Sequence, residues 1–508
     1  MAPLKLAIIG GGPSAFYVAS RLLSLFPKDE PLASQLRIHI YDRLWAPHGL
    51  VRYGVAPDHP EVKVCVFPPG PPVLSNAIPL SQNCTHKFDE VAADPRLRFF
   101  GNVQVGPQTP PAIAHSLPIS LSALRPHYTH LLLSTGCTVP TLHAALPPSD
   151  RTIPALSLVH WYTQHPTRPS PPPLHRTEHV SVIGQGNVAL DVARMLLTPP
   201  DVLDRYDVPA SVLDVLHRSA VRHVSIIGRR GPLQAAFTTK ELRELTTLPG
   251  ASMLPLAPEL VASPPAGTKL TRQQSRILQI LQQRAQTTTT TTPGAATAER
   301  TWSLDFFRSP TGFTSDGRHL ALAHTALDER SRAVPTGATS QLRTDLVVTA
   351  LGHHADPESA YYDPASGHLR TDRGRVLDAT GRALRRVYAS GWAATGARGV
   401  LAATMIDAYA VADAILGDHF GDSSGAAGAG CSDDDDDDDD DALVSSSDVD
   451  PESVPREIEE GVRDKRIVRY DQWKKVDAEE VRRGEEGKER ERMGWEEARD
   501  FLTRTAAW

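Results

Sequence analysis

The sequence predicts an α/β protein with two units of parallel strands and helices, and three observations indicate this fold class. An apolar strand at Leu4–Ile9 runs into a glycine-rich turn, after which Ser14–Phe26 has apolar residues at helical spacing. The same order of strand, turn and helix returns much later in the chain, at Val180–Ile183 and Val188–Leu197. Further short apolar strands are distributed among these elements, and alternating strands and helices are typical of parallel sheets.

The two turns fit the same pattern, G-x-G-x-x-A, at Gly10–Ala15 and at Gly184–Ala189. In this pattern the bare glycine backbone lets a pyrophosphate approach the N-terminus of the following helix. One such turn is a weak signal. Two of them predict two Rossmann-like dinucleotide-binding domains that hold their ligands face to face, the arrangement needed to pass a hydride between them.

The strand after the first helix is predicted at Arg37–Tyr41, and it ends at Asp42. An acid at this place usually accepts hydrogen bonds from a ribose hydroxyl, so Asp42 is a candidate ribose ligand. Further apolar strands are predicted at His130–Ser134, Leu346–Thr349 and Val387–Ser390.

In the second unit, the strand Val224–Gly228 is followed by Arg229 and Arg230. These arginines stand where an NAD site would carry an acid. Arginine offers a two-pronged donor to a 2′-phosphate, so this pair favours NADP over NAD. The alternative is that they are ordinary surface arginines at a strand end.

Composition and cysteine usage narrow the class of protein. A chain of 508 residues is long enough for two or three domains. No run of about 18 apolar residues occurs, so we expect no transmembrane segment. Four cysteines without a C-x-x-C pair give no redox dithiol and no zinc site by spacing. We expect no metal site and no nucleic-acid partner.

The charge is divided unevenly along the chain. Residues 421–508 hold 28 acidic and 14 basic residues, whereas the rest holds 39 basic and 32 acidic residues. The net positive charge of residues 1–420 favours an acidic partner, because opposite charges attract during encounter and match at the interface. An equal alternative is that these charges only keep the protein soluble. Nine consecutive aspartates predict a disordered acidic linker over 421–450, followed by a charged, weakly amphipathic C-terminal extension over 451–508.

Two segments raise questions about the reading frame. Residues 64–82 contain five prolines and begin and end with residues whose codons match intron boundaries. Our hypothesis is a retained intron, and the alternative is a real loop; sequencing the transcript decides between them. Only three residues precede the first strand and no transit peptide is visible, so either the protein stays in the cytosol or the start of its frame is missing.

These motifs together resemble the mitochondrial NADPH:adrenodoxin (ferredoxin) oxidoreductase family. The resemblance covers nearly the whole length and is most specific at Gly49–Lys63, Gly184–Arg194 and Gly228–Glu244; Trp473–Val481 resembles the family's tail. It implies a discontinuous FAD-binding domain over 1–137 and 346–420, with the tail packed on it, and an NADP-binding domain over 138–345. It also implies that a hydride passes from NADPH to FAD and that single electrons pass to an acidic [2Fe–2S] ferredoxin. A monomer in the mitochondrial matrix, associated with the inner membrane or free of it, is expected by the same resemblance.

The resemblance also assigns roles to residues, and it implies no side-chain nucleophile. The positions matching FAD contacts are Gly10, Gly12, Ser14, Asp42, Leu50, Val105, Trp392, Gly399, Val400 and Leu401. The positions matching NADP contacts are Gln185, Gly186, Asn187, Val188, Arg229, Arg230, Glu241 and again Gly399. At position 42 the family commonly has Glu. Asp42 would therefore have to bind the ribose with a shorter side chain. The alternative to a flavin contact for Trp392 is that it is only an aromatic residue of the hydrophobic core.

Four further residues have roles that the resemblance leaves open. His59 matches a histidine near the flavin that relays protons or electrons, with a plain turn histidine as the alternative. Asp191 orders the NADP site or takes part in that relay. Arg272 and Arg276 lie four residues apart on a predicted helix, so both point one way, and they match residues that dock ferredoxin. Ordinary surface arginines are the alternative.

Two other functions compete with this reading. One is another flavoprotein reductase with two dinucleotides, such as an amidotransferase-type electron-input subunit, although these usually carry cysteine clusters that are absent here. The other is a flavin-binding protein that keeps the fold of the enzyme but is catalytically impaired, because the insert at 64–82 damages it. Yellow protein that NADPH bleaches would favour the reductase, whereas colourless protein would favour the impaired protein.

Overall fold

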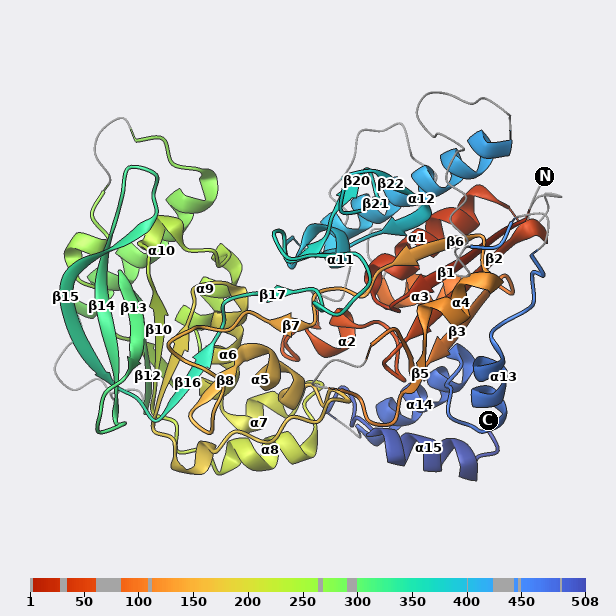
Figure 1. Cartoon of the computed structure of the whole chain (residues 1–508). Coiled ribbons are helices and arrows are strands. Elements are labelled where there is room, and N and C mark those ends of the chain that lie inside the picture. Colours follow the sequence, from red (N-terminus) through yellow and green to blue (C-terminus); the bar gives the residue numbers. More distant parts are fainter. Residues whose placement is uncertain are drawn as a thin grey trace, which may run out of the picture.

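The chain folds into two α/β units that lie side by side, with the C-terminal tail packed along one side (Figure 1). The computed structural model describes residues 3–27, 34–60, 84–107, 112–263, 268–289, 299–399, 401–423, 443–445, 449–484 and 487–508. The proposed intron at 64–82 and most of the acidic linker lie outside the described residues.

The first unit is built on a seven-stranded sheet whose strands come from distant parts of the chain. In order across the sheet they are β20 (Thr371–Asp372), β21 (Arg375–Leu377), β22 (Ala383–Ala389), β6 (His130–Leu133), β1 (Leu4–Ile9), β2 (Leu36–Asp42) and β3 (Leu97–Gly101). The strands from β22 to β3 are parallel, and β20 and β21 add an antiparallel edge. All six residues of β1 are buried because this central strand is covered on both faces.

The second unit is built on a six-stranded, wholly parallel sheet. Its order is β11 (Ala251–Met253), β12 (Arg300–Phe306), β10 (His223–Gly228), β9 (His179–Ile183), β16 (Leu346–Thr349) and β8 (Thr152–Pro154). The predicted division of the chain therefore needs a correction. We placed 346–420 with the first unit, but β16 lies in the second sheet because it pairs on both sides, with β9 and β8.

Smaller pairings complete the strand inventory. An antiparallel sheet extends the second unit, and three two-stranded pairs stand alone. The sheet is β13 (Arg308–Phe313), β14 (His319–Leu327) and β15 (Ala333–Arg343), and the pairs are β4 (Val103–Val105) with β5 (Leu117–Ile119), β7 (Val139–Pro140) with β17 (His353–His354), and β18 (Tyr362–Asp363) with β19 (His368–Leu369). β7 and β17 lie between the two units in Figure 1, where the chain crosses over and returns.

Helices cover both sheets. The first unit has α1 (Pro13–Leu25), α2 (Leu50–Tyr53), α3 (Cys84–Ala92), α4 (Leu121–Leu124), α11 (Trp392–Thr395) and α12 (Leu401–Ser423). The second unit has α5 (Ala155–Tyr162), α6 (Asn187–Leu197), α7 (Pro200–Leu203), α8 (Ala210–His217), α9 (Thr239–Thr246) and α10 (Arg272–Thr289). α12 continues to Ser423, so its last three residues lie within the predicted acidic linker. Among the described residues, every helix is too short or too polar to cross a membrane.

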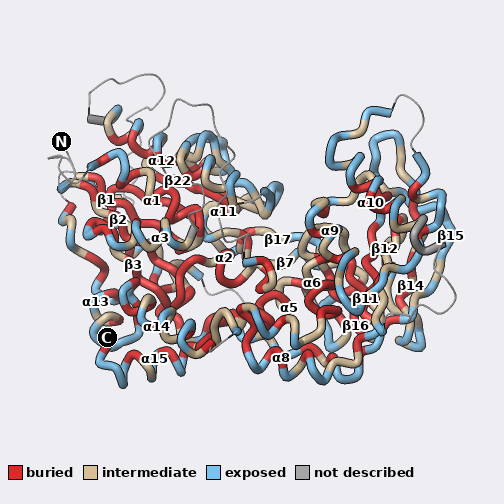
Figure 2. The backbone as a smooth tube through the Cα atoms, turned by 180° about the vertical axis from the view of Figure 1, so that it is seen from behind, coloured by how far each residue is buried: buried red, intermediate tan, exposed pale blue. Residues whose placement is uncertain are grey.

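The C-terminal tail forms α13 (Arg456–Arg463), α14 (Tyr470–Arg483) and α15 (Trp495–Arg504). These helices are part of the first unit's core, because Trp473 and Trp495 are buried against Trp45. Figure 2 shows the buried residues concentrated inside each unit, on the sheets and on the helix faces that cover them.

Candidate functional site

Two cavities lie side by side between the units and share part of their walls. The first has a volume of about 800 Å³ and the second of about 910 Å³. Both lie within the size range of small-molecule and cofactor sites. The residues lining both cavities are Leu50, Gly54, Val188, His353, Trp392, Leu401 and Thr404. Two ligands held in these cavities would therefore meet at a common wall.

The first glycine turn forms one end of the first cavity. Gly10 has φ +103°, and a Cβ there would lie 2.5 Å from the carbonyl oxygen of Ser134, just after β6. Its N–H donates to the Tyr41 carbonyl over 2.7 Å. A Cβ on Gly12, by contrast, would meet nothing within 4 Å, because Gly12 faces open space at the N-terminus of α1.

The second turn repeats this geometry in the second cavity. Gly184 has φ +131°, and a Cβ there would lie 2.2 Å from the carbonyl oxygen of Ala350, just after β16. Its N–H donates to the Ile227 carbonyl over 2.8 Å, and the space beside Gly186 is open. Each turn therefore leaves room for a ligand where a side chain would otherwise stand. The open N–H groups at a helix N-terminus suit an anion such as a pyrophosphate.

Asp42 lines the first cavity from the end of β2. One carboxylate oxygen accepts from the N–H of Gly11 and the other from the N–H of Leu44, each over 3.0 Å. Burial raises the pKa of Asp42 to about 6. The shorter side chain thus reaches the turn, and each oxygen keeps a further lone pair for a hydroxyl of a ligand.

The segment that carries Trp392 closes the first cavity against α1. Gly391 has φ +64°, and a Cβ there would lie 2.7 Å from Oγ of Ser14. Asp407 on α12 holds this turn by accepting from the N–H of Gly391 over 2.8 Å and from Oγ–H of Ser390 over 3.0 Å. Trp392 itself is half-buried and reaches both cavities, so it is not a plain core residue.

Arg229 and Arg230 are exposed at the edge of the second cavity. Their backbone is held in place, since the Arg229 carbonyl accepts from Thr325 and the Arg230 carbonyl from the N–H of Phe307. Their guanidinium groups form no ion pair with the described residues. Two exposed cations side by side at the end of β10 could bind an anionic group.

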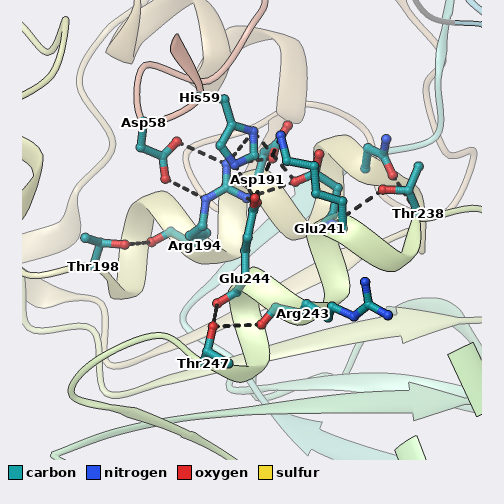
Figure 3. Close-up of polar contacts among 12 residues, drawn as sticks. Asp58, His59, Asp191, Arg194, Thr198, Thr238, Glu241, Arg243, Glu244 and Thr247 are labelled. Carbon is teal, nitrogen blue, oxygen red and sulfur yellow. Dashed lines mark hydrogen bonds and ion pairs between the residues drawn. The ribbon is translucent and has the colours of Figure 1, made fainter. Parts of the chain in front are cut away.

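A buried charged cluster lies beneath the second turn, centred on Arg194 of α6 (Figure 3). Its guanidinium is 2.6 Å from Asp58, 2.8 Å from Asp191 and 3.0 Å from Glu241. His59 joins the cluster, with Nε2 2.5 Å from Glu244. The segment Asp58–Pro60, α6 and α9 meet here, so one arginine partly neutralises four carboxylates.

The excess of carboxylates favours a bound proton. Burial, together with the nearby Glu241 carboxylate, raises the pKa of Asp191 to about 8, against the opposing effect of Arg194. Asp191 and His59 both line the second cavity, so a protonatable group lies within reach of a ligand there.

Replacing Asp191 with asparagine is expected to flatten the dependence of stability on pH. The folded state holds this proton between pH 3.8 and about 8, whereas the unfolded state releases it. The free energy of unfolding of the native protein therefore falls as pH rises through this window, by at most about 1.4 kcal/mol per pH unit. Urea unfolding of both proteins at several pH values between 5 and 8 measures the slopes. Parallel curves would contradict the assignment.

Nearly all sequence-predicted cofactor residues line one of the two cavities. The first cavity includes Gly10, Gly12, Ser14, Asp42, Leu50, Val105, Trp392 and Leu401. The second includes His59, Gln185, Gly186, Asn187, Val188, Asp191, Arg229, Arg230, Glu241 and Gly399. Val400 lies outside the described residues. Arg272 and Arg276 line neither cavity; both are exposed near the start of α10.

Two residues of the site were not predicted to be functional, Arg194 and Asp407. Arg194 is the last residue of the motif Gly184–Arg194, and it holds Asp58, Asp191 and Glu241 together. A signal existed for Arg194, because it stands three residues after Asp191 on a predicted helix and so shares its face.

Comparisons with known proteins identify relatives along nearly the whole chain. A scan against models of protein families found no match. The chain is 35% identical to human mitochondrial NADPH:adrenodoxin oxidoreductase, over 96% of this chain and 90% of that protein. The Drosophila melanogaster enzyme of that name is 30% identical over 96% of this chain and 91% of its own.

A bacterial relative has a known structure. The NADPH-ferredoxin reductase FprA of Mycobacterium tuberculosis is 33% identical over 82% of this chain and 84% of its own. Its structure in complex with NADPH superposes with a TM-score of 0.77 at 28% identity, covering 98% of this chain and 99% of FprA. The two-unit α/β fold is thus shared along the chain. The chain belongs to the NADPH:adrenodoxin oxidoreductase family.

Proposed function

We propose that this protein is an FAD-dependent NADPH:ferredoxin oxidoreductase, with FAD in the first cavity and NADPH in the second. The observation that carries the proposal is the common wall, because it lets two dinucleotides bound at separate glycine turns meet. The names of the relatives, NADPH:adrenodoxin oxidoreductase and NADPH-ferredoxin reductase, support the same activity. When bound, NADPH supplies a hydride to FAD, which passes the two electrons on singly.

The protein's own residues bind and orient the two groups. The Gly10 turn and Asp42 hold FAD, and the Gly184 turn holds NADPH. The fit is supported by the open spaces beside Gly12 and Gly186, each at a helix N-terminus. Leu50 and Trp392 in the common wall exclude water between the two ligands.

The domains follow from this assignment. The FAD-binding domain is discontinuous, formed by residues up to about 137 and by the segment from β18 to the end of α12. The NADP-binding domain lies between them and includes β16. The tail helices belong with the FAD-binding domain, on whose core they pack.

The partner is an acidic [2Fe–2S] ferredoxin. Arg272 and Arg276 support this, because both are exposed one turn apart on α10. The excess of basic residues outside 421–508 also favours an acidic partner. Location in mitochondria is supported by the names of the animal relatives, whereas FprA is bacterial. A monomeric enzyme is part of this proposal.

One experiment tests the activity in three steps. Purified protein should be yellow, and NADPH added without oxygen should bleach it. Adding a [2Fe–2S] ferredoxin and cytochrome c should then give cytochrome reduction that depends on ferredoxin and weakens with salt. Colourless protein, or yellow protein that NADPH leaves unbleached, would contradict the proposal.

Replacing Arg229 or Arg230 with alanine is expected to weaken NADPH binding far more than NADH binding. A lost charge-assisted pair to the 2′-phosphate costs roughly 1.5–3 kcal/mol, or about tenfold to a hundredfold in Kd. Titrations with both coenzymes measure this ratio. Arg243→Ala is the matched control, because Arg243 is exposed on α9 away from the cavity. Equal losses for both coenzymes would show that these arginines do not bind the 2′-phosphate.

A further inference from the structure

The C-terminal tail makes buried polar contacts with both units at once. Arg492, in the segment between α14 and α15, is 3% exposed. Its guanidinium forms an ion pair with Asp207 of the second unit, with Nε 2.6 Å from one carboxylate oxygen. It also donates to the Thr163 carbonyl in the second unit and, over 2.8 Å, to the Arg52 carbonyl in the first. One side chain therefore joins three parts of the fold.

A second buried pair adjoins the first. Arg52 on α2 donates to both carboxylate oxygens of Glu480 on α14, over 2.8 and 3.0 Å. Glu480 is fully buried, and one of its oxygens also accepts from the N–H of Met493, the residue after Arg492. The Arg52 guanidinium lies 4.5 Å from the ring centre of Trp473. Both ion pairs are buried and hydrogen-bonded, although Nε of Arg52 has no hydrogen-bond partner among the described residues. These ionic contacts therefore favour one arrangement of the three segments.

Both pairs converge on α2, which forms part of the wall between the cavities. Leu50 lines both cavities and Tyr53 lines the first. The Tyr53 carbonyl accepts from Oγ–H of Thr163 over 3.1 Å, so α2 is also tied directly to the second unit. Figure 1 shows α2 between the two units, with α14 and α15 beside them.

We propose that Arg492, Asp207, Arg52 and Glu480 are positioning residues. Through α2 they set the separation of the two units and hence the distance across which a hydride passes from NADPH to FAD. This inference rests on the proposed function. Displacing reacting groups by about 1 Å can slow a reaction about a hundredfold, so a small loosening of α2 would be measurable.

The test compares Asp207→Asn with Glu496→Gln in the full-length, FAD-loaded protein. Asp207→Asn keeps the shape of the side chain and removes its charge. Glu496→Gln is the matched control, because Glu496 pairs with Arg168 between the same tail and the same unit but at an exposed site. Each variant is measured for FAD content, for the Kd of NADP⁺, for the bleaching rate at saturating NADPH, and for hydrogen exchange at residues 50–54.

For Asp207→Asn we expect FAD content and the Kd of NADP⁺ to change little and bleaching to slow by about ten- to a hundredfold. Exchange should rise at the amides of Val51, Arg52 and Tyr53 in α2, which are hydrogen-bonded in the structure. Glu496→Gln should match the wild type in every measurement. If bleaching and exchange are both unchanged in Asp207→Asn, the proposal is overturned. It is also overturned if bleaching slows only as much as FAD or NADP⁺ binding is lost.

Two outcomes need a second measurement, namely a variant that does not fold and a wild-type protein that NADPH does not bleach. If Asp207→Asn does not fold, Arg492→Lys replaces it, because lysine keeps the charge but cannot serve the three acceptors that the planar guanidinium reaches. If NADPH fails to bleach even the wild type, the proposed function fails. The exchange measurement still tests whether these pairs hold α2 in place.

Discussion

Gly10→Ala is expected to destabilise the protein by roughly 2–6 kcal/mol and to abolish its FAD content, through backbone strain and overpacking together. The backbone at Gly10 has φ +103°, which a side chain disfavours. The new Cβ would also lie 2.5 Å from the Ser134 carbonyl oxygen, which belongs to the backbone and cannot rotate away. Thermal unfolding and flavin absorbance measure the two effects.

Two other glycines serve as controls for Gly10. Gly12→Ala should fold normally and still lose FAD, because its Cβ enters open space that the pyrophosphate would occupy. Gly417→Ala should keep FAD and gain up to about 1 kcal/mol, since Gly417 lies in helix α12 with nothing near its Cβ. A Gly10→Ala protein with native stability and colour would contradict the geometry of the turn.

Arg194→Met is expected to have an effect of similar size. It would leave Asp58, Asp191 and Glu241 buried together without their cation. Breaking a buried ion pair from one side costs about 3–5 kcal/mol, and the remaining carboxylates would take up protons to reduce their repulsion. Urea unfolding at pH 5.5 and pH 8 should show a larger loss of unfolding free energy at pH 8, because the clustered carboxylates hold protons less readily there.

The control for this prediction is Arg21→Met. Arg21 pairs with Asp413 over 3.0 Å, but both side chains are substantially exposed. Such pairs contribute up to about 1 kcal/mol and are screened by salt. If Arg194→Met costs no more than Arg21→Met, the buried cluster does not stabilise the fold as described.

The central parallel strands were predictable because each is a short apolar run that is buried on both faces. The strands β12 and β15 have alternating or exposed residues and were not predicted. Leu4–Ile9 and Leu346–Thr349 were predicted with the observed limits, and α6 began one residue earlier than predicted. Periodicity does not say which sheet a strand joins, however. Leu346–Thr349 was therefore assigned to the wrong unit, since pairing with β9 and β8 depends on residues far away in sequence.

The tail shows a similar limit of the residue pattern, although the family resemblance implied that the tail packs on the first unit. Its sparse apolar residues indicated a weakly amphipathic appendage, and the helices do have charged outer faces. Trp473 and Trp495 nevertheless complete the first core, whereas Val481, from the same set, is 49% exposed. Two large aromatic side chains bury enough surface to fasten a helix that is otherwise polar. Their number and size, rather than the average hydropathy, decided the packing.

By itself, the sequence determined the two glycine turns, the strands before them and the arginine pair at the rim, because turn geometry depends on which residues lack a Cβ. Only the tertiary structure decided that the two cavities share a wall, that Arg194 gathers carboxylates from three segments, and that Arg492 joins both units. The reason is physical: a backbone turn is a local conformation, whereas a buried ion pair exists only after distant segments pack and exclude water.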